Sequence, residues 1–190
     1  MWGETRVQLP SDGEGPLFHR CYYIDIARPR LTREALMARI QRDLPDFAPA
    51  ALAAFRKVKG HPQRMQPGDE YDIRILGPWN GQVRVTEVTP TSFSFMTLAG
   101  HPEAGQITFA VQKSPVAEGA LRFQIRSWAR SRDMLVSLTY REGKIGKELQ
   151  KNAWVTFCER VVKASGGQSL GEVTVETEER DFTGEVIPIV

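Results

Sequence analysis

The sequence has few of the residues that build disulfides and metal centres. It contains only two cysteines and three histidines among 190 residues. Cys21 and Cys158 form no C-x-x-C pattern, so we expect buried free thiols in the reducing cytoplasm. His19, His61 and His101 show no H-x-H or H-x-x-x-H spacing, so we expect no metal site.

The sequence also lacks the segments that mark several other classes of protein. No apolar run approaches the roughly 18 residues of a membrane span, and the N-terminus lacks the basic and apolar regions of a signal peptide. Neither a G-x-G-x-x-G nor a G-x-S-x-G pattern occurs, so we expect no cofactor. The net charge of +2 argues against a nucleic-acid partner.

The composition is that of an ordinary globular domain, with 41% hydrophobic and 25% charged residues. Gly, Pro and charged residues dominate residues 1–17, which predicts a flexible N-terminal arm. We expect a single domain over residues 18–167, followed by an acidic C-terminal extension over residues 168–190. Residues 166–190 contain six acidic residues and one arginine. This tail can dock on the more basic body or simply increase solubility, and we favour solubility.

Alternating apolar residues predict most of the secondary structure. A strand is expected around residues 21–26, followed by a helix over 32–44 and a second short helix that starts near Pro49 and includes Leu52 and Phe55. Five short segments of period two then follow, centred on residues 71–75, 83–85, 93–95, 107–111 and 121–125. They are joined by turns too short for a crossover helix, which predicts an antiparallel meander.

A long helix is predicted after the meander, over residues 147–164, where apolar residues recur at nearly every fourth position. One face of the meander is apolar and must be covered, and this helix is the obvious cover. The predicted fold is α+β of helix-grip type, in which a curved antiparallel sheet wraps around a long C-terminal helix.

Several motifs resemble those of an uncharacterised family of bacterial and plant proteins, a domain of unknown function. They are Gly68-Asp69-Glu70, the turn 77–81 (GPWNG), the stretch 97–105 (TLAGHPEAG), the stretch 127–131 (SWARS), and Lys147-Glu148-x-Gln150 before Trp154. The resemblance covers about residues 17–167 and implies the helix-grip superfamily of START and birch-pollen-allergen-like proteins. It implies no activity.

The most unusual stretch is the connection between the third and fourth segments, because His101 and Glu103 lie two residues apart in it. A carboxylate beside an imidazole can orient the ring for proton transfer. In the alternative interpretation, which we favour, the two side chains only shape the turn. Gly100 and Gly105 fit both interpretations, since glycine supplies positive φ in tight connections.

Other side chains are candidates for contact with a ligand. Arg130 can pair with Glu103 or with a ligand carboxylate, or form a salt bridge at a strand end. Trp128 precedes it by two residues, and Trp79 can gate a cavity or pack under its own loop. The full set of predicted ligand-binding residues is Trp79, Phe95, His101, Glu103, Trp128, Arg130 and Trp154, with Tyr71, Phe93, Phe109 and Phe123 as further lining.

A helix-grip fold leaves space between sheet and helix, and such a cavity suits a small, mostly apolar ligand. The leading hypothesis is therefore a binding protein for a small apolar molecule. The alternatives are an enzyme, such as a cyclase or hydrolase, that uses His101 and Glu103 for proton transfer, and a protein-interaction module. The sequence favours binding over catalysis and does not fix the oligomeric state.

Overall fold

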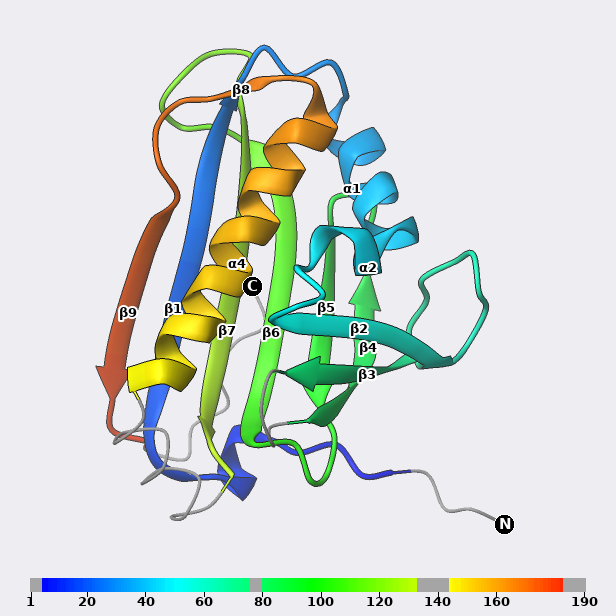
Figure 1. Ribbon diagram of the computed structural model, residues 1–190, viewed down its shortest axis with the longest axis vertical. Helices are drawn as coiled ribbons and strands as arrows, with labels where there is room; N and C mark the ends of the chain where they lie inside the picture. Colours follow the sequence, from blue (N-terminus) through cyan, green and yellow to red (C-terminus); the bar gives the residue numbers. More distant parts are fainter. Residues whose placement is uncertain (1–4, 76–79, 133–143, 183–190) are drawn as a thin grey trace.

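The computed structural model describes residues 5–75, 80–132 and 144–182, and side chains in these ranges except those of residues 75 and 144–150. The described residues form one antiparallel sheet with helices on one face (Figure 1). The elements in chain order are η1 (Pro10–Asp12), β1 (Glu14–Ala27), α1 (Arg33–Arg42), α2 (Leu44–Phe47), β2 (Ala53–Lys59), β3 (Glu70–Ile75), β4 (Gly81–Val88), β5 (Ser92–Thr97), β6 (Glu103–Lys113), β7 (Leu121–Ser131), α4 (Lys144–Ser165), β8 (Gln168–Ser169) and β9 (Thr174–Arg180).

The sheet contains nine strands within the described residues, in the order β2-β3-β4-β5-β6-β7-β1-β8, and β9 also pairs with β1. Strands β3 to β7 follow each other in space as in sequence, which confirms the predicted meander. The first strand then returns to pair with β7 along its length, with Ile24 opposite Phe123. The curved sheet and the C-terminal helix confirm the helix-grip architecture.

Helix α4 crosses the inner face of the sheet in front of β1, β7 and β6 (Figure 1). Its Phe157 is fully buried, and its ring centroid lies 5.4 Å from that of Phe109 and 5.7 Å from that of Phe123. Because each aromatic ring removes a large apolar area from water, this cluster stabilises the packing of the helix on the sheet. The predicted long helix is thus confirmed. The chain turns out of it at Gly166, where φ is +70°.

Helices α1 and α2 cover the other part of the inner face. Thr32 begins α1 as its N-cap, because its Oγ1 accepts a hydrogen bond from the N–H of Ala35 at 3.2 Å. The predicted second helix, from Pro49 through Phe55, is wrong. Phe55 belongs to β2, which pairs with β3, and the short α2 ends before that strand begins.

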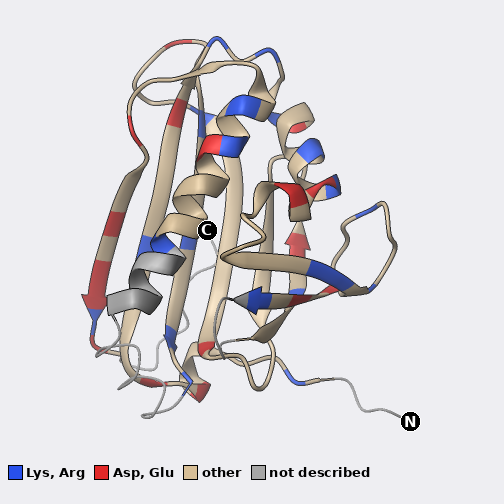
Figure 2. Cartoon of the chain, in the orientation of Figure 1, with Lys and Arg blue, Asp and Glu red and all other residues tan. Residues whose placement is uncertain are grey.

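The two ends of the described chain belong to the sheet. The predicted flexible arm over residues 1–17 is wrong for the described part of that segment, because β1 begins at Glu14 and Val7 pairs with Leu98 in a bridge. The acidic extension forms β8 and β9, and β9 pairs with residues 17–23 of β1. Figure 2 shows acidic residues spaced along β9. Their charge disfavours pairing of this edge strand with a strand of another molecule.

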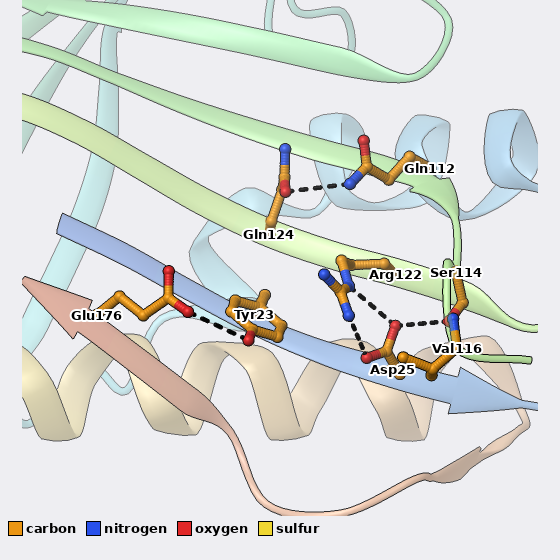
Figure 3. A network of polar contacts seen from close by, with 8 residues as sticks. All are labelled: Tyr23, Asp25, Gln112, Ser114, Val116, Arg122, Gln124 and Glu176. Atoms are coloured by element: carbon orange, nitrogen blue, oxygen red, sulfur yellow. Dashed lines mark hydrogen bonds and ion pairs between the residues drawn. The ribbon is translucent and has the colours of Figure 1, made fainter. Parts of the chain in front are cut away.

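Polar contacts join the strands on the outer face (Figure 3). Arg122 donates two hydrogen bonds to the Asp25 carboxylate, at 2.9 and 2.6 Å, and Ser114 Oγ donates a third at 2.7 Å. The Arg122 hydrogen bond is the main reason that the pKa of Asp25 is lowered. Tyr23 connects β1 to Glu176 of β9 at 3.3 Å. These contacts link β1 to β7, to β9 and to the loop after β6 on the outer face, while Tyr22, Ile24 and Ile26 of β1 face the helices.

Within the described part of the chain, no helix is long and apolar enough to cross a membrane.

Candidate functional site

A cavity of about 90 Å³ lies between the inner face of the sheet and α4. We call it the inner cavity. Because side chains alternate along a strand, every second residue of β4 to β7 faces this side. The apolar part of the lining comes from the strands, α4 and the residue before β2. It comprises Leu52, Ala53, Phe55, Ile73, Val83, Phe95, Ile107, Ala129, Ala153 and Trp154.

Polar side chains line one end of the inner cavity. The end of β5, the turn after it and the start of β6 contribute Thr97, His101 and Glu103. Ser127 of β7 joins them, because the antiparallel register places it opposite Ile107. The inner cavity is therefore amphipathic, with an apolar body and a polar end.

The turn between β5 and β6 is held by the N-terminal segment. The buried Gln8 side chain donates through Nε2 to the carbonyls of His101 and Glu103, both at 2.9 Å. Its Oε1 accepts from the N–H of Gly100 at 3.2 Å. Gly100 has a φ of +96°, as a tight connection requires. One amide thus satisfies three backbone groups of the turn and fixes the polar end of the cavity.

His101 lies in the same turn, is 6% exposed, and its ring contacts the backbone of Glu103. Nδ1 lies 3.0 Å from both the amide nitrogen and the carbonyl oxygen of Glu103, so the backbone of Glu103 engages this ring nitrogen. Burial lowers the pKa of His101. The ring also packs directly against the backbone at Gly81, where a Cβ would lie 2.1 Å from Cδ2. The ring is a neutral, tightly enclosed group at neutral pH.

The Glu103 carboxylate pairs with Arg20. Oε1 lies 3.1 Å from Arg20 Nη1, and the two side chains are only 19% and 10% exposed. Arg20 reaches across β7 from β1, over small side chains such as Ala129. A partly buried pair of this kind is energetically significant, since either charge left alone would be poorly solvated.

Two predicted cavity residues lie elsewhere. Of the roles considered for Arg130, pairing with Glu103 does not appear among its contacts in the described residues, and Trp128 and Arg130 do not line the inner cavity. Both belong to the outer-facing set of β7. Trp128 stacks on His19 with ring centroids 3.8 Å apart. Arg130 donates to the carbonyls of Gly15 at 2.8 Å and Pro10 at 3.1 Å, so it anchors the N-terminal segment.

The remaining predicted residues divide into three groups. Phe95, His101, Glu103 and Trp154 line the inner cavity. Tyr71, Phe93, Phe109 and Phe123 are buried core residues outside its lining, and Phe93 stacks on Phe109 with centroids 4.6 Å apart. Trp79 lies outside the described residues.

Sequence reasoning missed Arg20, Ser127 and Gln8. A signal existed for the first two, because Arg20 has the same strand parity as Tyr22 and Ser127 the same as Ile125, both on the inner face. No signal in the sequence marked Gln8, whose role depends on contacts with residues more than 90 positions away.

Among the described residues, no group of three or more His, Cys, Asp or Glu side chains is arranged to hold a metal ion.

Comparisons with known proteins show the family and the fold. A sequence model of the family described as a domain of unknown function, DUF1990, matches residues 6–160. No curated protein gives a significant match.

Solved structures with a similar fold include a hypothetical protein from Helicobacter pylori, with a TM-score of 0.58 and 8% identity over 87% of this chain and 99% of that chain. Norcoclaurine synthase from Thalictrum flavum gives a TM-score of 0.54 at 11% identity, over 86% of this chain and 95% of that one. Its complex with dopamine and hydroxybenzaldehyde gives 0.50 at 12% identity, over 80% and 94%. At these identities the likeness shows the fold alone.

Proposed function

This chain belongs to the DUF1990 family, and from that premise we propose that it binds a small, mostly apolar molecule in the inner cavity. The observation that carries the proposal is a mostly apolar cavity of about 90 Å³ between the sheet and α4. Protein interiors are close-packed, and voids larger than a water molecule are few. At about 24 cal/mol per Å³, an empty void of this size would cost about 2 kcal/mol. A ligand that fills it recovers that packing energy.

The size of the inner cavity limits the ligand. An apolar cavity of about 150 Å³ in another protein holds benzene. The inner cavity is smaller, so it suits a compact group such as a single ring with modest adjustment of its walls, or the apolar end of a longer molecule. The similar structure of norcoclaurine synthase was determined with dopamine and hydroxybenzaldehyde, which are single-ring compounds. This supports a ligand of that size class.

A cavity-filling variant tests the proposal. Ala153 is 5% exposed and lines the inner cavity from α4, so Ala153→Leu places new atoms in the void. We expect saturable binding of benzene to the wild type, measured by titration calorimetry and by intrinsic tryptophan fluorescence, to which Trp154 in the cavity wall contributes. Ala153→Leu should abolish that binding while leaving the free energy of unfolding equal or higher.

Ala110→Leu is the matched control, because Ala110 lies on the outer-facing set of β6 and does not line the cavity. It should leave binding unchanged. Absence of any saturable benzene site in the wild type would overturn the proposal, as would binding that Ala153→Leu leaves intact.

Catalysis by His101 and Glu103 is the second candidate function, favoured by their shared position at the polar end. Two contacts count against it. Nδ1 of His101 is engaged by the backbone of Glu103, and the Glu103 carboxylate is paired with Arg20. The catalytic proposal predicts that a single-ring ligand incubated with the wild type changes its mass, and that His101→Gln stops this change without loss of binding.

A further inference from the structure

We infer that Arg126 of β7 binds a small oxyanion on the outer face of the sheet. The guanidinium of Arg126 is a partly buried cation to which the described residues offer no carboxylate or carbonyl acceptor. A phosphate or carboxylate group from solution would supply that acceptor. The site lies on the opposite face of the sheet from the inner cavity, so the inference does not depend on the proposed function.

Arg126 is the middle one of three arginines that point outward from β7 at intervals of four residues. The first, Arg122, donates two hydrogen bonds to the Asp25 carboxylate, at 2.9 and 2.6 Å. The last, Arg130, donates to two backbone carbonyls of the N-terminal segment, at 2.8 and 3.1 Å. Both flanking guanidinium groups therefore have oxygen acceptors within the chain.

The guanidinium of Arg126 differs from both of them. Its Nε is buried and forms no hydrogen bond. Its two Nη nitrogens form none with the part of the chain that the structure describes, and they are not among the buried atoms, so they are open to solvent. The thiol of Cys21 lies within reach of the guanidinium, but a thiol is only a weak acceptor. A partly buried charge without a good acceptor is costly, and an anion would remove that cost.

The register of the sheet explains why Arg126 finds no acceptor. It lies opposite Thr108 of β6 on one side and opposite Cys21 of β1 on the other. The positions around it on the outer face are Cys21, Thr108, Gln124 and Trp128, with His19, Tyr23, Gln106 and Ala110 on the diagonals. None of these eight residues carries a carboxylate. Arg122, by contrast, lies directly opposite Asp25.

A second buried nitrogen without a partner lies beside Arg126. It is Nε2 of His19, whose ring stacks on Trp128 with centroids 3.8 Å apart. Burial lowers the pKa of His19, the nearby carboxylate of Glu178 raises it, and the charges of Arg126 and Arg180 lower it further. An anion held by Arg126 would offset one of these positive charges. It should therefore raise the pKa of His19.

An oxyanion matches the donors that this surface presents. The two Nη nitrogens form a planar fork of N–H groups, which suits two oxygens of one carboxylate or phosphate group. Gln124 lies two residues along the same face, and Figure 3 shows it beside Gln112, from which its Oε1 accepts a hydrogen bond at 3.1 Å. Its Nε2 donates to no described residue and adds a neutral donor near the fork. Phosphate, with more charge and more acceptor oxygens, should bind more tightly than a carboxylate.

An NMR titration of the full-length chain tests the inference, with sodium phosphate, acetate or chloride added at constant ionic strength and pH 7. The reporter is the indole N–H signal of Trp128, which Trp128→Phe identifies among the four tryptophans. We expect a saturable shift with phosphate at a Kd of about 1 mM and binding of acetate about tenfold weaker. Chloride should give no saturable shift. The His19 ring should titrate at a higher pH in phosphate than in chloride.

Variants assign the binding to Arg126. Arg126→Gln should abolish the saturable shift, whereas Arg64→Gln, which removes the same charge from an exposed side chain, should leave the Kd unchanged. Gln124→Glu places a carboxylate of equal size near the fork and should weaken phosphate binding at least about tenfold. Phosphate should also raise the Tm of the wild type more than that of Arg126→Gln, because only the wild type binds the anion specifically.

The outcomes that would overturn the inference are separate from those that bear on the inner cavity. A phosphate shift that does not saturate overturns it, and so does an equal loss of binding in Arg64→Gln and Arg126→Gln. If Arg126→Gln fails to fold, Gln124→Glu keeps the inference falsifiable, because unchanged phosphate affinity in that variant contradicts the site. Benzene binding should be the same in Arg126→Gln and the wild type, so failure of either proposal can be recognised without the other.

Discussion

Replacing Gly81 with alanine gives a direct test of the position of the His101 ring. The added Cβ would lie 2.1 Å from Cδ2 and 2.7 Å from Cγ of the ring, whereas ordinary contacts lie between 3.4 and 4 Å. The ring must therefore move by more than about 1 Å, which breaks the 3.0 Å hydrogen bond from the Glu103 amide. An unsatisfied buried amide costs about 1–3 kcal/mol. Overpacking costs about 1–3 kcal/mol more.

We therefore expect Gly81→Ala to lower the free energy of unfolding by about 2–6 kcal/mol, measured by urea denaturation. The control is a double-mutant cycle with His101→Ala, which removes the ring that causes the clash. In that background Gly81→Ala should be neutral or slightly stabilising, because alanine restricts the unfolded chain more than glycine does. An equal loss of stability in both backgrounds would refute the position assigned to the ring and with it the description of the polar end.

Three further predictions concern pH, thiol reactivity and the sheet edge. Because the pKa of His101 is lowered in the folded chain, the unfolded chain binds this proton at a higher pH than the folded chain does. The free energy of unfolding should therefore fall as the pH drops below about 6.5. Denaturation curves measured at several pH values should show a flatter slope for His101→Gln. Burial raises the pKa of both Cys21 and Cys158, so neither thiol should react with a disulfide reagent at pH 8 until the chain unfolds. Fast labelling of the native protein would contradict this prediction. Deleting residues 168–190 uncovers the edge of β1. We expect the free energy of unfolding to fall by about 2–4 kcal/mol and the shortened chain to self-associate in sedimentation experiments. A stable monomeric product would show that β9 is dispensable.

The fold was largely predictable from the sequence, because strict alternation in the meander and a long apolar stripe in the C-terminal helix leave few other arrangements. The exception is Phe55. The run of alanines before it favours a helix locally, but pairing with β3 and burial of the Phe55 ring favour a strand. Tertiary contacts of this kind override weak local propensity, and they cannot be read from one segment alone.

The candidate site was predictable only in part, and strand parity explains the difference. His101 and Glu103 stood out because they lie in an unusual turn. Arg130 was considered as a partner of Glu103 although its parity in β7 is that of Arg122, on the outer face. Arg20 satisfies the parity rule and does form an ion pair with Glu103. Its distance of 83 positions from Glu103 leaves no local pattern to connect them.

The pairing of β1 also has a consequence for synthesis on the ribosome. Strand β1 ends at Ala27, but its partner β7 begins only at Leu121, and β9 begins at Thr174. At about 5–20 residues per second, the first strand waits roughly 5–20 s for the neighbour that buries its apolar side chains. During that time Tyr22, Ile24 and Ile26 have no sheet to join. The nascent chain is therefore expected to be a substrate for chaperones that shield exposed strands, and late closure around β1 should limit the rate of folding.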